Sequence, residues 1–431
     1  MSIHPLAQTL NETLNAGNSI AYSLLSRKGK GIYFPSKGIL GQSAEAKGKD
    51  INATIGTALE DDGSPLTLGI LEEMISTDKS AFLYAPSYGD PTLRTRWKEM
   101  LAQKNPNLAG KLYSTPVVTG ALTHGLSVAG YLFADEDDQI IIPDLYWDNY
   151  DLLFEQGYGA HFKTFNTFIN GGFDVPALEA ALMDGPVGKR IVLLNFPNNP
   201  TGYTPSKAEV TAIVQVLVES AEAGNRILAI LDDAYFGLVY EDGIATESIF
   251  APLADAHENI LALKLDGPTK EDYVWGFRVG FLTFGFKGAT EAQLKALESK
   301  AAGTVRGTLS NVPNISQALL LAAYSSDVYE AQKQSKYNTL KKRYDKIVEI
   351  LAAHPEYADS FCAMPFNSGY FMCVKLNGVD AETVRNTLLE KYSTGVIVLS
   401  GLVRLAFSSV PLDKLEQLFS NLHNAVMEVK G

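Results

Sequence analysis

Cysteine and long apolar runs are scarce in this chain of 431 residues. Its two cysteines, Cys362 and Cys373, have neither metal-ligand spacing nor the number that a disulfide framework needs. No stretch approaches the roughly 20 apolar residues of a membrane-spanning helix, so we expect no membrane partner. The amino terminus lacks the charged and apolar regions of a signal peptide. These absences favour a reducing cytoplasm as the location.

Positive charge is also scarce. Lys and Arg total 36 against 49 Asp and Glu, which gives a formal net charge of -13. Nucleic acid phosphates attract a basic face, and no local run of Lys and Arg supplies one, so we expect no nucleic acid partner. The six histidines share no metal-ligand spacing, and we predict no metal site. The hydrophobic content of 46% is ordinary for a globular enzyme.

Short apolar runs alternate with helix-compatible stretches between about residues 110 and 285. The runs are continuous rather than alternating, which is typical of parallel strands that are buried on both faces. They lie at 116–120, 139–143, 190–195, 226–231 and 259–264, with helical patterns at 122–134, 148–157, 175–183 and 205–223. The pattern predicts a large α/β domain with a mainly parallel sheet covered by helices.

A second, smaller domain is expected because the chain exceeds what one hydrophobic core usually organises. A long helix-forming segment at 312–353 would leave the large domain. Beyond it, short strands at 370–375, 396–399 and 404–407 and helices near 379–391 and 411–428 indicate an α+β arrangement. We predict a large domain at 66–320 and a small domain formed by 1–65 and 321–431.

Polar residues follow the predicted strands in a distinctive order. Asn-Asn-Pro-Thr-Gly stands at 198–202, Asp-Asp-Ala-Tyr at 232–235, and Thr-Lys-Glu-Asp-Tyr-Val-Trp-Gly-Phe-Arg-Val-Gly at 269–280. In an open parallel sheet, ligands bind beyond the carboxyl ends of the strands. An amide, a carboxylate, a phenol, an amine and a guanidinium would meet there, and a pyridoxal phosphate enzyme needs this set of groups.

With these motifs, the chain resembles a fold type I pyridoxal-phosphate-dependent aminotransferase of class I/II, similar in layout to aspartate and aromatic aminotransferases. The matching residues run from Tyr84 to Arg404. The resemblance implies a large domain with a mainly parallel, seven-stranded sheet covered by helices, plus a smaller α+β domain. It also implies pyridoxal 5'-phosphate as cofactor, an amino acid and a 2-oxo acid as substrates, and a homodimer with shared active sites.

The resemblance assigns catalytic roles to Lys270, Asp232 and Tyr235. Lys270 would form a Schiff base with the cofactor and then move the substrate proton, which requires a lowered amine pKa. Asp232 would keep the pyridine nitrogen protonated. Tyr235 would bind the cofactor's phenolic oxygen. The residues themselves leave Lys264, also at a strand end, and Asp233 as alternatives for the amine and the carboxylate.

Further cofactor contacts follow from the same resemblance. Asn199 would join Tyr235 at the phenolic oxygen, and Trp147 would stack on the pyridine ring, with Tyr146 as the alternative aromatic. Arg278 would bind the phosphate with its planar fork of donors. The start of a helix, where free N–H groups attract an anion, would complete the phosphate cradle with Ala121, Leu122 and Thr123.

The cradle departs from the family pattern at two places. Ala121 and Leu122 stand where relatives often have Ser or Gly, and Gly267 stands three residues before Lys270, where the family usually has a serine. We therefore expect backbone amides and the Thr123 hydroxyl to contribute more of the phosphate binding.

The substrate contacts implied by the resemblance are Arg404 for the α-carboxylate, together with Asn199 and Gly56. Tyr84 and Arg306 would reach the active site of the neighbouring subunit, Tyr84 at the phosphate and Arg306 at the side-chain carboxylate of a dicarboxylic substrate. A surface ion pair is the alternative role for Arg306.

The predicted function is that of a transaminase. Glutamate and 2-oxoglutarate are expected as one substrate pair, and aspartate or an aromatic amino acid belongs to the other. A pyridoxal-phosphate-dependent β-elimination lyase, which uses the same lysine and carboxylate, is the alternative. A regulatory module would need a basic helix-turn-helix, and a nicotinamide oxidoreductase would need a Gly-x-Gly-x-x-Gly turn; the sequence has neither.

Overall fold

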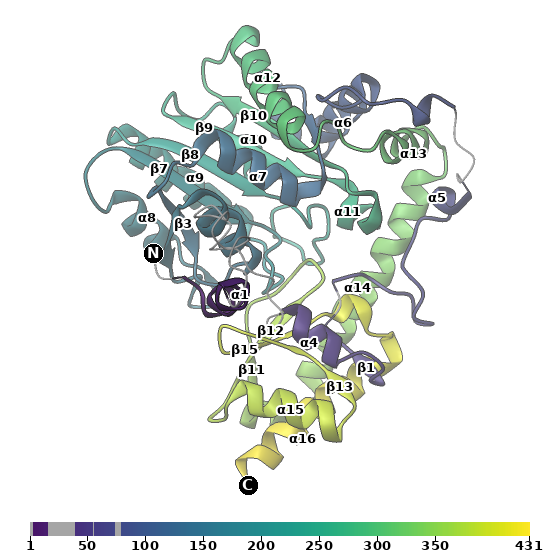
Figure 1. The fold of residues 1–431 in the computed structure, drawn as a ribbon. Coiled ribbons are helices and arrows are strands. Elements are labelled where there is room, and N and C mark those ends of the chain that lie inside the picture. Colours follow the sequence, from purple (N-terminus) through teal and green to yellow (C-terminus); the bar gives the residue numbers. More distant parts are fainter. Residues whose placement is uncertain (1–2, 16–38, 55, 74–78) are drawn as a thin grey trace.

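The structure, a computed structural model, describes residues 3–15, 39–54, 56–73 and 79–431. A seven-stranded sheet lies in the upper part of the molecule and a four-stranded sheet in the lower part (Figure 1). Within the described ranges, no helix combines the length and the apolar character needed to cross a membrane.

The large sheet has the strand order β2-β10-β9-β8-β7-β3-β4. All its strands are parallel except β10, which runs antiparallel to both neighbours. The strands are β2 (Val117–Thr119), β3 (Gln139–Pro143), β4 (His161–Phe165), β7 (Lys189–Asn195), β8 (Arg226–Asp232), β9 (Ile260–Asp266) and β10 (Gly280–Phe286). Five of these strands match predicted runs to within two residues at each end. The predicted α/β class with a mainly parallel sheet is confirmed.

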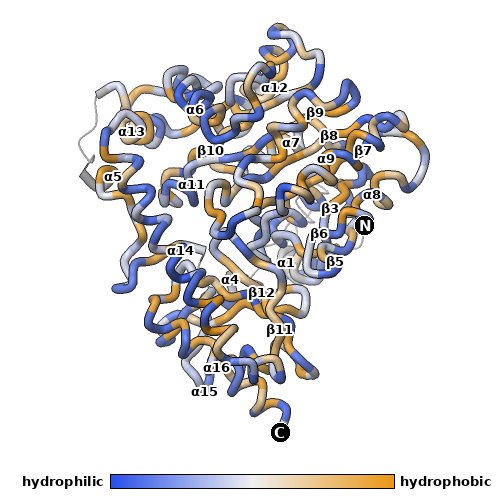
Figure 2. The backbone as a smooth tube through the Cα atoms, turned by 180° about the vertical axis from the view of Figure 1, so that it is seen from behind, coloured by the Kyte–Doolittle hydropathy of each residue, from blue (hydrophilic) through white to orange (hydrophobic). Residues whose placement is uncertain are grey.

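Helices cover both faces of this sheet, as the continuous apolar strands require. Alternate residues of β7 illustrate the two faces, because Leu193 packs in one core cluster and Leu194 in the other. Figure 2 shows the hydrophobic strands between more hydrophilic outer segments. On the Leu193 face lie α6 (Pro91–Lys104), α7 (Ala121–Phe133) and α12 (Glu291–Thr308), and on the Leu194 face lie α8 (Val175–Met183), α9 (Lys207–Glu222) and α10 (Phe250–Leu253).

The helical segment predicted at 312–353 is two helices. Four residues separate α13 (Asn314–Tyr324) from α14 (Tyr329–Ala353), and α14 leads toward the lower sheet (Figure 1). The short connection at 325–328 lets the chain change direction between them.

The lower sheet has the order β11-β12-β15-β14 and is antiparallel. Its elements are β11 (Phe361–Ala363), β12 (Met372–Leu376), β14 (Ile397–Leu399), β15 (Leu402–Leu405), α15 (Ala381–Lys391) and α16 (Leu415–Lys430). A separate parallel pair joins β1 (Ile51–Asn52) to β13 (Thr394–Gly395).

Short elements complete the described chain. They are α1 (Pro5–Asn15), α4 (Ile39–Glu45), α5 (Gly69–Glu73), β5 (Phe168–Ile169), β6 (Gly172–Phe173), α11 (Pro268–Glu271), the 3-10 turns η1 (Lys79–Phe82), η2 (Pro106–Leu108), η4 (Trp275–Phe277), η5 (Pro355–Asp359), η6 (Phe407–Ser409) and η7 (Leu412–Lys414), and the π-helix η3 (Asp151–Gln156). The division of the chain into a large domain at 66–320 and a small domain from the two flanking segments stays a prediction.

Candidate active site

A cavity of about 420 Å³ lies beyond the carboxyl ends of β7 and β8. The predicted site residues that line it are Gly56, Ala121, Leu122, Thr123, Trp147, Asn199, Asp232, Tyr235, Lys270, Arg278 and Arg404. The further lining residues are Ser43, Thr54, Tyr150, Asn195, Ala234, Thr269 and Phe371. Sequence segments more than 350 residues apart therefore meet around one space. Ile55, next to Gly56, lies outside the described residues.

Asp232 is the last residue of β8 and is almost fully buried. Its Oδ2 accepts a hydrogen bond of 2.7 Å from the Tyr150 hydroxyl, and its Oδ1 accepts one of 3.1 Å from the Ala234 amide. Burial raises the pKa of Asp232, while the Tyr150 bond and the Lys270 charge oppose that rise. The sequence analysis did not identify Tyr150, although an aromatic three residues after Trp147 was the available signal.

Lys270 lies in α11 and extends into the cavity, where its Nζ is 5.0 Å from the centre of the Tyr235 ring. Burial lowers the pKa of the Lys270 amine to about 8; the Asp232 charge opposes this and the Arg278 charge adds to it. An amine with this pKa is uncharged in roughly a tenth of the molecules at pH 7. Such an amine can act as a nucleophile and as a base.

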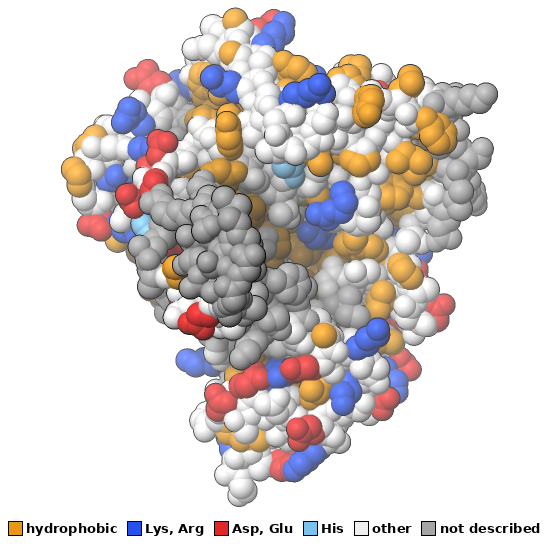
Figure 3. Space-filling view, in the orientation of Figure 1, with side chains coloured by type: hydrophobic (Ala, Val, Ile, Leu, Met, Phe, Trp, Pro, Cys, Tyr) orange, Lys and Arg blue, Asp and Glu red, His pale blue; other side chains and the backbone are white. Residues whose placement is uncertain are grey.

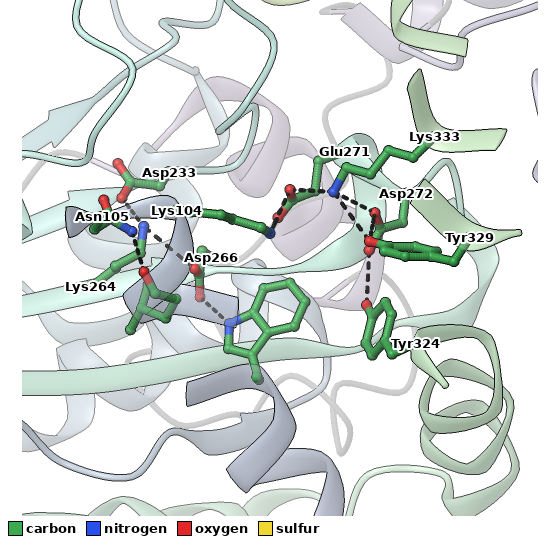
Figure 4. A network of polar contacts seen from close by, with 12 residues as sticks. Lys104, Asn105, Asp233, Lys264, Asp266, Glu271, Asp272, Tyr324, Tyr329 and Lys333 are labelled. Carbon is green, nitrogen blue, oxygen red and sulfur yellow. Dashed lines mark hydrogen bonds and ion pairs between the residues drawn. The ribbon is translucent and has the colours of Figure 1, made fainter. Parts of the chain in front are cut away.

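The two alternatives left open by the sequence pair with each other outside the cavity. Lys264 in β9 is fully buried and forms an ion pair with Asp233 and a second one, at 3.4 Å, with Asp266 (Figure 4). Neither Lys264 nor Asp233 lines the cavity. The geometry therefore favours Lys270 over Lys264 as the amine and Asp232 over Asp233 as the carboxylate.

Arg404 in β15 joins the lower sheet to the cavity. Its Nη1 donates to Asn199 Oδ1 at 3.0 Å, and its Nη2 donates to the Thr54 carbonyl at 3.4 Å. The guanidinium carbon lies 4.3 Å from the Phe371 ring centre, and the Nε atom is buried with no hydrogen-bond partner. A buried guanidinium without a carboxylate partner among the described residues is suited to an anionic ligand.

The start of α7 forms another wall of the cavity. Ala121 has a φ of 61°, in the left-handed region, and no side chain caps the helix at Gly120. The Gly120 amide instead donates to His124 Nδ1 at 3.0 Å, and His124 Nε2 contacts the Thr308 hydroxyl at 2.9 Å. Uncapped N–H groups at a helix start form a ready anion site.

The two places where the sequence departs from the family pattern, Ala121-Leu122 and Gly267, lie side by side in the structure. A Cβ at Gly267 would lie 3.0 Å from Gly280 Cα and 3.2 Å from Leu122 Cδ1, and one at Gly280 would lie 2.7 Å from the Ala121 backbone. A side chain at 267 would therefore be tight against Leu122 and Gly280, and these neighbours would have to move by a few tenths of an ångström. Thr269, which sequence reasoning did not single out, offers a hydroxyl instead, because its Oγ1 is buried in the cavity wall without a partner.

The remaining predicted residues divide in two groups. Trp147 lines the cavity, whereas Tyr146 does not and donates to Asp151 Oδ1 at 3.0 Å. Tyr84 and Arg306 also lie outside the cavity lining of this chain. Tyr84 is 91% exposed, and exposed Arg306 donates to Ser310 Oγ at 2.9 Å.

A model of the family described as aminotransferase class I and II matches residues 49–422. The chain belongs to this family. It is therefore a pyridoxal-phosphate-dependent aminotransferase. It is 25% identical over 366 residues to the aspartate aminotransferase of Bacillus subtilis (strain 168), an alignment that covers 80% of this chain and 83% of that protein.

Two further comparisons agree. The chain is 26% identical to a probable aspartate/prephenate aminotransferase of Aquifex aeolicus (strain VF5) over 75% of this chain and 79% of that protein. Its fold is similar to the crystal structure of an aminotransferase from Anaerococcus prevotii, with a TM-score of 0.82, 23% identity and coverage of 95% and 100% of the two chains. The aminotransferase thus has the fold of these enzymes, as predicted.

Proposed function

We propose that the aminotransferase binds pyridoxal 5'-phosphate through Lys270 and transfers an amino group from an amino acid to a 2-oxo acid. Glutamate and 2-oxoglutarate form one pair, and aspartate or an aromatic amino acid belongs to the other. One observation carries the proposal: an amine with a lowered pKa, a buried carboxylate and a buried guanidinium, those of Lys270, Asp232 and Arg404, face one cavity.

The cavity fits the phosphate end of this cofactor. The uncapped start of α7 supplies N–H groups. Arg278 is exposed and lines the cavity, and its Nη1 donates to the Trp275 carbonyl at 3.3 Å. The Thr269 hydroxyl has no partner in the protein, although it is buried. An unpaired buried hydroxyl is costly unless a ligand satisfies it. The Thr269 hydroxyl, the α7 amides and the positive charge of Arg278 therefore support phosphate binding at this wall.

The other wall fits the ring and the substrate. When bound, pyridoxal phosphate supplies an aldehyde that exchanges amines and a ring that accepts electrons. Asp232 would hold a proton on the ring nitrogen, and Trp147 would cover the ring face. Lys270 would take the proton from the substrate α-carbon and return it after transfer, while Arg404 binds the α-carboxylate.

A homodimer with shared active sites is part of the proposal. Hydrophobic side chains are exposed on η1 and the residues after it, directly after α12, and on α13, and Figure 3 shows such side chains gathered over this region. They include Phe82, Leu83, Tyr84, Leu309 and Ile315. An exposed apolar patch of this kind suits a partner subunit, and Tyr84 and Arg306 would then complete the neighbour's site. We propose the cytoplasm as the location.

The β-elimination lyase has no comparable support, because the family and the relatives described above are aminotransferases. The two reactions differ in stoichiometry. Incubation of the holoenzyme with glutamate alone should convert one equivalent of cofactor to its amine form and release one equivalent of 2-oxoglutarate. Catalytic release of pyruvate and ammonia from a β-substituted amino acid, with no conversion by glutamate, would reject the proposal.

A further inference from the structure

Two carboxylates directly follow Lys270 in the chain, and neither lines the cavity. The side chain of Glu271 is only 2% exposed and points toward Lys104 and Lys333 (Figure 4). Its oxygens accept hydrogen bonds of 3.0 and 2.8 Å from Lys104 Nζ in α6 and one of 2.8 Å from Lys333 Nζ in α14.

Asp272 is held by the same group of residues. Its Oδ1 lies 2.8 Å from Lys333 Nζ and accepts a bond of 2.7 Å from the Tyr329 hydroxyl, and its Oδ2 accepts one of 2.8 Å from Tyr324. Two carboxylates thus meet two ammonium groups (Figure 4), and these contacts join four elements, α6, α11, α13 and α14, at the residues that follow Lys270.

The arrangement matters because of what faces Lys270 on its other side. Asp232 from β8 opposes the lowering of its pKa, and Arg278 adds to that lowering. Tyr235 and Arg404 line the same cavity. An unpaired carboxylate one residue from the amine would add a second negative charge in a poorly solvated place, which favours the charged ammonium form.

The charges of Lys104 and Lys333 keep the Glu271 carboxylate paired, so that it does not stabilise the charged form of Lys270. Burial alone raises the pKa of Glu271, but the two lysines lower it to about 2, so the carboxylate stays ionised and paired. Removal of one partner from a buried ion pair leaves an uncompensated charge.

We propose that Lys104 and Lys333 are positioning residues, a proposal that rests on the proposed function of Lys270. They hold Glu271 and Asp272 away from the Lys270 amine and fix the short helix α11 that carries Lys270. Neither lysine lines the cavity.

The test measures how Lys270 titrates in the full-length, cofactor-free chain, by pH-dependent labelling with an amine-selective reagent and peptide mass spectrometry. Lys104→Gln is the first variant, because Lys104 contacts Glu271 but not Asp272. We expect its Lys270 titration midpoint to rise by about half a pH unit or more. Lys341→Gln, an exposed position of the same α14 that carries Lys333, is the matched control and should leave the midpoint unchanged.

A second substitution distinguishes an electrostatic effect on Lys270 from a purely structural effect of losing the Lys104 side chain. Glu271→Gln in the Lys104→Gln background should return the Lys270 midpoint to the wild-type value. Glu271→Gln alone should lower the Lys270 midpoint, and this measurement is informative even if Lys104→Gln does not fold. An unchanged midpoint in Glu271→Gln and Lys104→Gln, or a rise that Glu271→Gln does not reverse, would overturn the proposal.

The absorbance titration of the holoenzyme should shift in the same directions. Because the labelling needs no cofactor, shifted midpoints in a chain that fails to bind pyridoxal phosphate would support the positioning role and reject only the proposed function.

Discussion

The Tyr150 hydroxyl donates a hydrogen bond of 2.7 Å to Asp232 in the buried wall of the active-site cavity. Burial opposes ionisation of this carboxylate, and the Tyr150 bond favours it. Burial raises the pKa of the Tyr150 hydroxyl well above its ordinary value. The phenol is therefore a donor at every working pH, so Asp232 keeps one fixed partner.

Tyr150→Phe should lower kcat about ten- to a hundredfold, because a hydrogen bond to a charged group contributes roughly 1.5–3 kcal/mol. KM for the amino donor should change little, since Tyr150 contacts Asp232 rather than Arg404. Steady-state kinetics test this. Tyr146→Phe is the control, because its hydroxyl bonds Asp151 outside the cavity. Equal losses in both variants would contradict the role given to Tyr150.

Thr269→Val should weaken binding of pyridoxal phosphate about tenfold, since valine keeps the shape but removes the hydroxyl. Stability should hardly change, because this hydroxyl has no protein partner. Cofactor titration followed by absorbance measures the affinity. Thr283→Val is a close control, since the Thr283 hydroxyl is also buried and unpaired but lies in β10 outside the cavity lining. Unchanged affinity in Thr269→Val would remove Thr269 from the phosphate site.

The strands of the large domain could be predicted because parallel buried strands are continuous apolar runs. β4 was not predicted, since it is an edge strand with polar residues. β10 was not predicted either, since it begins two residues after Arg278 and its apolar run merges with that motif. The only proline of the long helical segment at 312–353 is Pro313 at its start, and no glycine or proline marks the break between α13 and α14.

The site could be predicted where a motif fixes a spacing, and not where only the fold brings residues together. Tyr150 and Asp232 are 82 positions apart, and an aromatic in a helix-compatible stretch is ordinarily a core residue. The spacing to Arg278 already favours Lys270 over Lys264 in the sequence, and of the two only Lys270 lines the cavity. The absence of a serine at 267 could be seen from the sequence, but the tight packing of Leu122 and Gly280 around this position could not.

The lowered pKa of Lys270 predicts a cost in stability for the cofactor-free protein. An amine with a pKa of about 8 when folded and an ordinary value of 10.5 binds fewer protons in the folded state between those pH values. The cost is therefore complete below about pH 8 and disappears as the pH rises through 10.5. Lys270→Met should raise the free energy of unfolding by about 1–3 kcal/mol at pH 7.

Urea unfolding of wild type and Lys270→Met at pH 7 and pH 10 measures this difference, which should shrink at the higher pH. Lys341→Met, at an exposed position, should give no such pH-dependent difference. A Lys270→Met variant that is less stable than wild type at pH 7 would show that the buried Lys270 amine does not lower the free energy of unfolding.

Shared active sites predict complementation between two inactive variants. Lys270→Ala lacks the amine and Arg306→Met lacks the guanidinium proposed to reach the neighbour. A mixed dimer would contain one site with both groups intact. Mixing the two variants under conditions of subunit exchange should restore activity with aspartate to about a quarter of the wild-type level or less, since half of the dimers are mixed and each has one intact site. No recovery despite proven exchange would contradict the shared site.

The bond between Lys270 and the cofactor is the central claim, and borohydride reduction of the holoenzyme tests it most directly. Reduction fixes the cofactor to the amine that holds it, and peptide mass spectrometry then locates that amine. We predict one modified residue, Lys270, and loss of both the visible absorbance of the bound cofactor and the activity in Lys270→Ala. Modification at Lys264 or elsewhere, or a Lys270→Ala variant with full absorbance and activity, would contradict the account.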